Sequence, residues 1–119
     1  MTELNLIVIK TNKIAEQFDF YSSLGIQFDY HKHGNGPYHY ASIGQRPVIG
    51  IYPLPKGITS PDHTTRLGFA VEKLDLLIET LISKEFKIIE LPKINEWGYS
   101  AIVQDIDGRK IELTEIPGI

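Results

Sequence analysis

The sequence predicts an α+β fold made of two copies of one unit, strand-helix-strand-strand-strand, whose curved sheets face each other around a cleft. The first observation is an internal repeat, since residues 6–29 match residues 66–89 in pattern without a gap. The second is that residues 38–53 match residues 100–115 in the same way. Two copies are too few for a solenoid, so we expect two packed units. A cleft between two such units is where small molecules bind.

The first unit is predicted from hydrophobic patterns and turn residues. β-Branched residues open the chain, Thr11 and Asn12 provide an N-cap, and Gly25 provides the helix stop. Glycine and proline mark turns at 33–37 and 44–45. The predicted elements are a strand at 4–10, a helix at 14–24, and strands at 27–32, 38–43 and 48–52.

The second unit repeats this order after a segment that contains three prolines, residues 53–63. Asp107 and Gly108 predict a two-residue hairpin turn, and residues 92–98 predict a loop. The predicted elements are a strand at 66–71, a helix at 73–84, and strands at 86–91, 99–104 and 110–115. We therefore expect a single domain over residues 1–119, with module one at 4–53, a linker at 54–64 and module two at 65–117.

Composition excludes several classes of partner. The net charge is −3 and basic residues form no block, so we expect no nucleic-acid partner. No apolar stretch approaches the roughly 20 residues of a membrane span, so we expect no membrane partner. The chain has no cysteine, which excludes disulfides, thiolate metal sites and cysteine nucleophiles. These features fit a cytoplasmic protein.

Strand alternation assigns one face of each sheet to the helix and the other to the cleft. In the second unit the predicted cleft-facing residues come from the first and last strands: Arg66, Gly68, Ala70, Lys110, Glu112 and Thr114. In the first unit the matching residues are Leu6, Val8, Lys10, Gly50 and Tyr52.

The chain resembles the vicinal oxygen chelate superfamily, which contains glyoxalase I, the bleomycin resistance proteins and the extradiol dioxygenases. The likeness rests on TNKIAEQFDFYSSLG at the first helix, RLGFAV at the opening of the second unit and WGYSAIVQDIDGRKIEL at its closing hairpin. It spans nearly the whole chain. It implies the fold more strongly than a function, because this fold hosts isomerases, dioxygenases, thiol transferases and drug-binding proteins.

The resemblance also implies where a metal would sit. The family's ligand positions fall on Leu6, Gly50, Arg66 and Glu112, of which only Glu112 offers a donor atom suited to a metal. A divalent ion normally needs three or more protein ligands. We therefore expect no metal and no other cofactor at the usual place, and instead an Arg66–Glu112 ion pair in a partly desolvated cleft.

Histidines and aromatic residues supply the remaining candidates. We interpret His31 and His33 as a polar strand end, although a metal pair is the alternative. His39 is expected to be buried and hydrogen bonded, with a role as general base as the alternative. Tyr38, Tyr40 and Tyr52 could form an aromatic wall with Trp97, or simply pack on the sheet.

The favoured function is a non-metal small-molecule binding protein of the bleomycin-resistance type, with a planar, aromatic or amphipathic ligand. The residues predicted to bind the ligand are Tyr40, Tyr52, Arg66, Trp97, Glu112 and His39. One alternative is a lyase, isomerase or dioxygenase with displaced metal ligands, such as His39 with Glu112 and another histidine. Another is a structural or regulatory dimer. In each case we expect a homodimer, because a second copy would cover exposed sheet surface.

Overall fold

The computed structural model describes residues 1–117 and contains two compact units, one up to Asp62 and one from His63 onward. Each unit is a strand, a helix and three further strands, which confirms the prediction of two tandem βαβββ modules. The boundary between the units falls inside the proline-containing segment 53–63. The cleft expected between the units stays a prediction.

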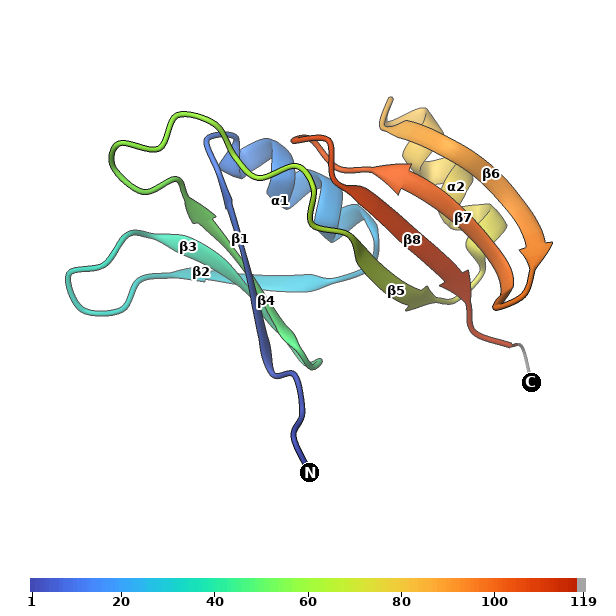
Figure 1. Cartoon of the computed structure of the whole chain (residues 1–119), viewed down its shortest axis with the longest axis horizontal. Helices are drawn as coiled ribbons and strands as arrows, with labels where there is room; N and C mark the ends of the chain where they lie inside the picture. Colours follow the sequence, from blue (N-terminus) through green and yellow to red (C-terminus); the bar gives the residue numbers. More distant parts are fainter. Residues whose placement is uncertain (118–119) are drawn as a thin grey trace. The chain divides into compact units, whose positions relative to one another are not determined.

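The first unit is a mixed four-stranded sheet with α1 on one face (Figure 1). Its strands lie in the order β1-β4-β3-β2, and β1 is parallel to β4. The Lys13 N–H donates to Thr11 Oγ1 at 3.0 Å before the helix, and Gly25 ends it at a φ of +100°. The elements are β1 Leu6–Thr11, α1 Ile14–Ser23, β2 Gln27–His31, β3 His39–Ile43 and β4 Val48–Pro53.

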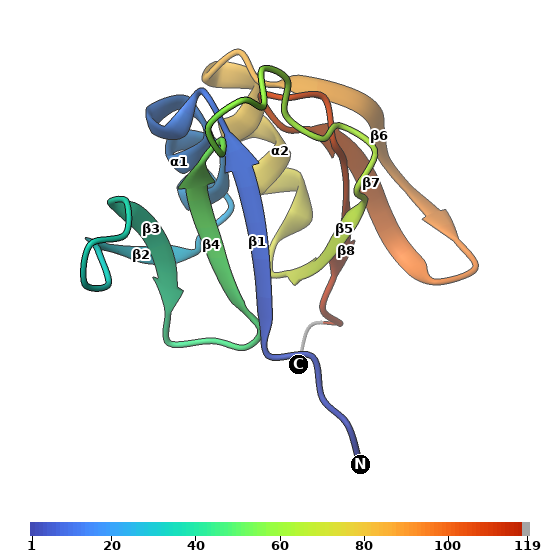
Figure 2. The same cartoon turned by 60° about the vertical axis from the view of Figure 1, so that its left-hand side comes forward.

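The second unit has the same topology, with strand order β5-β8-β7-β6, β5 parallel to β8, and α2 on one face of the sheet (Figure 2). Its elements are β5 Leu67–Val71, α2 Leu74–Ser83, β6 Lys87–Asn95, β7 Gly98–Gln104 and β8 Lys110–Glu115. No helix within residues 1–117 is both long enough and apolar enough to cross a membrane.

Alternation along the strands produces the two faces that the sequence predicted. In β8, Ile111 and Leu113 are fully buried on the α2 side. In β4, Ile49 and Ile51 are buried in the same way on the α1 side. The residues predicted to face away from the helices include Leu6, Val8, Lys10 and Lys110, and these are exposed. The two cores therefore lie between each sheet and its helix, and the opposite face of each sheet lies outside its core.

Strand β6 differs from the prediction. We expected it to end at Leu91 and to be followed by a loop, but it continues to Asn95. Its pairing with β7 is irregular between Ile88 and Glu90 and again between Glu90 and Lys93. β6 is an edge strand, where a proline within the strand removes no hydrogen bond to a second neighbour, so Pro92 does not end it.

The closing hairpin also differs, because its loop has three residues rather than two. The Asp105 N–H donates to the Arg109 carbonyl, and Gly108 follows the turn at a φ of +98°. The Asp105 carboxylate accepts from the backbone N–H of Asp107 and of Arg109. The Arg109 guanidinium contacts the carboxylates of Asp105 and Asp107 at 3.1 Å each. All three side chains are buried, so the loop is held by a desolvated ion network.

We expect Arg109→Met to lower the free energy of unfolding by about 3–5 kcal/mol, because it leaves buried carboxylates without their cation. Urea denaturation followed by circular dichroism measures this change. Lys110→Met is the matched control, since Lys110 is the neighbouring exposed cation and should change stability by about 0.5 kcal/mol or less. A loss below about 1 kcal/mol for Arg109→Met would contradict the role given to this network.

Candidate functional site

A pocket of ≈ 230 Å³ lies on the face of the second sheet that points away from α2. Strands β6, β7 and β8 form its floor, and Arg66 comes from the residue just before β5. The lining residues are Arg66, Glu90, Lys93, Asn95, Trp97, Ser100, Ile102, Glu112 and Thr114. Three of the residues predicted to bind a ligand, Arg66, Trp97 and Glu112, therefore lie around one pocket.

The Arg66–Glu112 pair is present, as the sequence predicted. Arg66 Nη2 lies 2.6 Å from Glu112 Oε1, and β5 is the direct neighbour of β8. A charged hydrogen bond of this length is among the stronger polar contacts in proteins. The two side chains are 49% and 41% exposed, however, so water solvates much of the pair. Within this unit the pair is therefore partly desolvated, as expected, and accessible to a ligand.

Trp97 stands at the rim of the pocket in the turn between β6 and β7. Its backbone N–H donates to Asn95 Oδ1 at 3.0 Å, and Asn95 Nδ2 donates to Ser100 Oγ at 2.5 Å. Gly98 follows with a φ of +120°, a conformation that favours glycine. These contacts fix the turn but leave the indole 68% exposed. An exposed aromatic ring held by a fixed turn is suited to stacking on a planar ligand.

The pocket carries balanced charge. Arg66 and Lys93 are opposed by Glu112 and Glu90, and Lys93 Nζ lies 3.7 Å from Glu90 Oε2. The charges therefore cancel formally, so a ligand gains little from net charge alone. The arrangement favours a dipolar or neutral polar group.

Sequence reasoning missed the β6 contribution to this pocket. Glu90, Lys93 and Asn95 line it, whereas the sequence predicted a loop over residues 92–98. Ser100 and Ile102 were within a predicted strand, yet their facing was not assigned. Their alternation with the buried Ala101 and Val103 is the signal that could have found them.

Tyr99 points away from the pocket. Its hydroxyl donates to Asp75 Oδ1 at 2.6 Å, in the first turn of α2. This hydrogen bond raises the pKa of the Tyr99 hydroxyl above its ordinary value, and desolvation and the charges of Asp75 and Glu115 act in the same direction. The Tyr99 hydroxyl therefore keeps its proton, and it contacts α2 rather than the pocket.

The aromatic wall predicted for the first unit is divided between the two faces of its sheet. The Tyr40 ring stacks on Phe18 of α1 at 4.1 Å between centroids, so Tyr40 faces the helix. Tyr52 lies on the opposite face, where its ring stacks on His39 at 3.9 Å. The prediction that Tyr40 and Tyr52 share a face is wrong, because Tyr40 pairs with Ile51 and the next residue along β4 points the other way.

Tyr52 lies against Gly50, one of the positions where the resemblance to the vicinal oxygen chelate superfamily implied a metal ligand. A Cβ atom placed on Gly50 would lie 2.7 Å from Tyr52 Cε1, so the tyrosine ring covers the glycine. The same Cβ atom would lie 3.6 Å from Val8 Cγ2. The ring of Tyr52 therefore occupies the space where a ligand side chain at position 50 would stand. Gly50 allows this close approach because it has no side chain.

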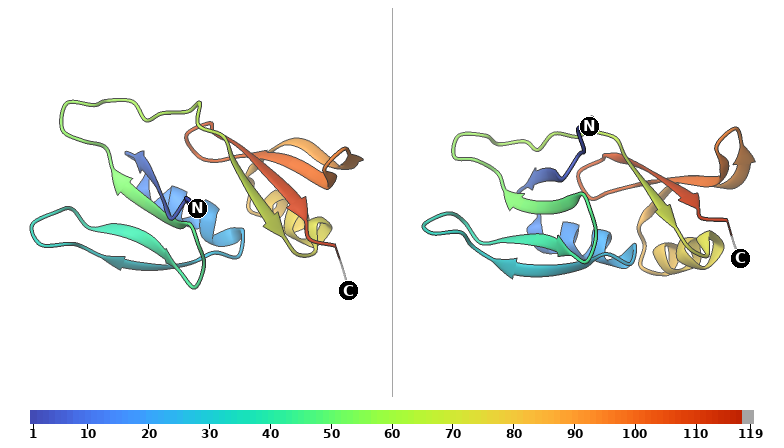
Figure 3. Two further views of the ribbon diagram at one scale, coloured as in Figure 1. Left: turned by 60° about the horizontal axis from the view of Figure 1, so that its bottom comes forward. Right: turned by 90° about the horizontal axis from the view of Figure 1, so that it is seen from below.

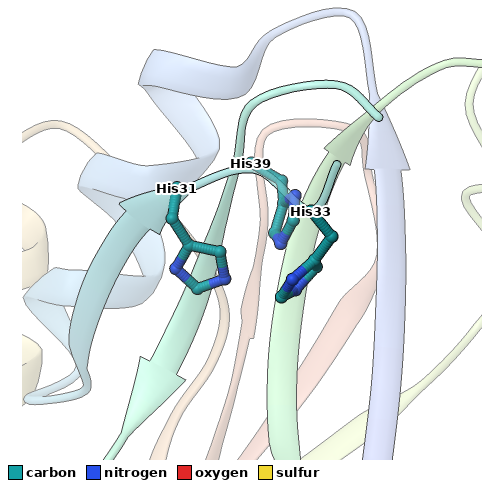
Figure 4. Close-up of side chains that lie close together, drawn as sticks. All are labelled: His31, His33 and His39. Atoms are coloured by element: carbon teal, nitrogen blue, oxygen red, sulfur yellow. The ribbon is translucent and has the colours of Figure 1, made fainter. Parts of the chain in front are cut away.

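His39 is buried, as predicted, with 2% of its surface exposed. It belongs to a histidine cluster with His31 and His33, whose rings lie 4.7 and 5.1 Å from its own. Figure 4 shows the three side chains side by side, from the end of β2, the following loop and the start of β3. His31 and His33 lie at and just beyond the end of β2, as expected for a polar strand end, and His39 lies beside them.

The hairpin register explains the cluster. The two residues of each β2–β3 pair are equally far from Asn35 along the chain. Gln27 therefore pairs with Ile43, and His31 pairs with His39. His33 lies in the turn beyond, and the hairpin extends past the end of α1 (Figure 3). This symmetry about the turn at 33–37 was visible in the sequence, and could have placed His31 opposite His39. His39 and Glu112, which we had considered as one displaced metal site, belong to different units.

No protein-family model and no curated protein sequence matches the chain. Solved structures match it throughout, including a member of the glyoxalase/bleomycin resistance protein/dioxygenase superfamily from Sphaerobacter thermophilus (15% identity, 98% of each chain, TM-score 0.75). TnmS3, an antibiotic binding protein from a Streptomyces species, is similar at 18% identity, 98% of each chain and TM-score 0.75. An integron cassette protein from V. cholerae matches at 20% identity, 98% of this chain, 97% of that one and TM-score 0.74. Structural similarity at these low sequence identities shows that the chain has this fold.

We expect the coupling free energy between Arg66 and Glu112 to be small, about 0.2–1 kcal/mol, because both groups are partly solvated. A double-mutant cycle with Arg66→Met, Glu112→Leu and the combined variant, measured by urea unfolding, gives this value. Added salt should reduce the coupling further. A coupling above about 2 kcal/mol would mean that the pair is a structural support rather than an accessible binding element.

Proposed function

From the fold of the glyoxalase/bleomycin resistance protein/dioxygenase superfamily, which this chain has, we propose that it is a small-molecule binding protein. The proposed ligand is a planar or amphipathic organic molecule, held without metal chemistry in the pocket of the second unit. Trp97 stacks on its ring, and the Arg66–Glu112 pair binds a polar group.

The observation that carries this proposal is the combination of an exposed, fixed indole with an accessible ion pair in one pocket. Apolar surface for stacking and a few convergent polar groups are typical of small-molecule sites. The volume of ≈ 230 Å³ is below the roughly 300–1,000 Å³ of sites that enclose a drug-sized ligand. This pocket therefore holds one end of the ligand.

The similarity to TnmS3, an antibiotic binding protein, supports a binding role for this fold. Tyr52 and His39, which the sequence predicted as ligand contacts, lie outside this pocket, on the sheet face of the first unit that points away from α1. Tyr40 packs on Phe18 of α1 and is not included in the proposed site.

The second candidate is an enzyme of the same superfamily with displaced metal ligands. The observation that favours it is the gathering of three imidazoles on one face of the first sheet. Such an enzyme would use His39 with His31 and His33, rather than His39 with Glu112. Turnover that disappears on removal of metal by a chelator would favour the enzyme over the binding protein.

Binding should be visible in the fluorescence of Trp97, the single tryptophan of the chain. We expect a ligand from a library of planar aromatic compounds with polar substituents to change the emission and to raise the melting temperature. Arg66→Met should weaken that ligand roughly tenfold, which corresponds to losing one charge-assisted hydrogen bond.

Leu76→Ala is the matched control for this experiment. Leu76 is an exposed apolar residue of α2 outside the pocket, so its replacement should leave both signals unchanged. Trp97→Ala removes the fluorescence, so its binding is measured by thermal shift, and we expect a loss of at least about tenfold in affinity. Equal affinity of the Trp97→Ala and wild-type proteins would contradict the proposed pocket.

We also propose that the protein is a homodimer. Each sheet ends in strands with an open edge, β1 and β2 in the first unit and β5 and β6 in the second. Large apolar side chains are exposed on these strands, including Leu6 and Ile94. Sedimentation equilibrium at micromolar concentration should give twice the mass of 13.5 kDa. A mass of one chain under these conditions would contradict the dimer.

A further inference from the structure

We propose that His31, His33 and His39 form a binding site for a divalent late transition-metal ion, with Zn²⁺ as the expected occupant. Each histidine offers one ring nitrogen, and these three nitrogens all lie within 4.8 Å of one another. The site belongs to the first unit. Its residues differ from the positions where the family resemblance would place a metal, which are Leu6, Gly50, Arg66 and Glu112.

His31 and His39 each use Nδ1 in a hydrogen bond, so Nε2 is the nitrogen that remains available on both rings. His39 Nδ1 lies 3.1 Å from the Pro37 carbonyl oxygen, which can only accept, so Nδ1 carries the proton. The neutral His39 ring then has its lone pair on Nε2. His31 Nδ1 lies 3.0 Å from Asp29 Oδ2, and the same reasoning places the His31 lone pair on Nε2. Carboxylate and carbonyl partners of this kind orient most metal-binding histidines.

His39 Nε2 is the second independent indication of a ligand. This nitrogen is buried and has no hydrogen-bond partner within residues 1–117. Leaving a buried polar atom unsatisfied costs free energy, and native proteins rarely tolerate it without a reason. A metal ion bound to this lone pair would remove the cost.

The first unit holds two of the three rings in place. The His39 ring is stacked on Tyr52, with an angle of 10° between the ring planes. His31 pairs with His39 across β2 and β3 and is fixed by Asp29. His33 is exposed in the loop, so its side chain can turn toward the other two without disturbing the core. A tetrahedral Zn²⁺ with Zn–N distances of about 2.0–2.1 Å needs nitrogens about 3.3 Å apart, so the three rings must move closer together when the ion binds.

The donor set decides the class of metal. Imidazole nitrogen suits Zn²⁺, Cu²⁺, Ni²⁺ and Co²⁺, whereas Mg²⁺ and Ca²⁺ prefer oxygen ligands. Three histidines leave a fourth position for water or for another ligand, as in zinc sites with three protein ligands. Asp29 adds a nearby negative charge that offsets part of the charge of the ion. Zn²⁺ is thus the expected ion, and Co²⁺ is a spectroscopic substitute for it.

The test uses the full chain purified without a histidine tag and dialysed against a chelator that is then removed. Titration calorimetry with ZnCl₂ should show one equivalent bound per chain, and the melting temperature should rise. MgCl₂ should produce neither effect at the same concentration. Co²⁺ should give the visible absorption of a tetrahedral site, and Zn²⁺ should displace it.

His33→Ala is the main variant, because His33 is exposed and its loss should not prevent folding. We expect it to weaken Zn²⁺ binding at least about tenfold, and Asp29→Asn to weaken it roughly tenfold through the orientation of His31. His63→Ala is the matched control, since His63 is the fourth histidine and lies outside the cluster. Trp97→Ala should also leave Zn²⁺ binding unchanged, which keeps this site separate from the proposed ligand pocket.

Histidine side-chain NMR gives a readout that a purely structural role would not produce. Zn²⁺ should shift the Nε2 resonances of His31 and His39, while Nδ1 of both stays protonated. Three results would overturn the proposal: no binding at one equivalent, equal loss of affinity in His33→Ala and His63→Ala, or unchanged Nε2 resonances at saturating Zn²⁺.

Discussion

The parallel pairing of the first and last strand of each unit is the constraint on which the rest of the structure depends. β1 pairs with β4 and β5 with β8, so the chain must return across the sheet after its helix and two further strands. This pairing buries the helix-facing residues of both strands in one core. It also brings residues from opposite ends of a unit side by side on the other face, as with Arg66 and Glu112. The same pairing sets Val8 beside Gly50 in the first unit.

The chemistry of each unit is concentrated on its hairpin between the second and third strands. The β2–β3 hairpin is symmetric about Asn35, and it brings His31, His33 and His39 together. The β6–β7 hairpin turns at Trp97, where Asn95 and Gly98 fix the indole at the rim of the pocket. Loops held by a rigid sheet can vary in sequence without loss of the core. The two units thus share one topology but carry different functional groups.

In the first unit, the small residue Gly50 affects how the side chains on the sheet face away from α1 are arranged. Gly50 leaves room for the ring of Tyr52, which covers a position where the family resemblance implied a metal ligand. That ring in turn stacks on His39 and fixes the orientation of its imidazole. The unsatisfied Nε2 of His39 then lies in the histidine cluster, on the strand next to β4. Direct contacts thus link Gly50, Tyr52 and His39 on one face of the first sheet.

The sequence by itself determined the order of the elements, the two faces of each sheet and, through its resemblance to a known superfamily, the Arg66–Glu112 pair. The order and the faces follow from the internal repeat and from strand alternation, which are properties of local order along the chain. The tertiary structure alone decided which face Tyr40 takes, how far β6 continues beyond Pro92, and which histidines meet. Those outcomes depend on the register between strands that are distant in sequence, and a shift of one residue moves every side chain to the other face. The exposed fraction of the Arg66–Glu112 pair likewise depends on neighbouring side chains that no local pattern in the sequence specifies.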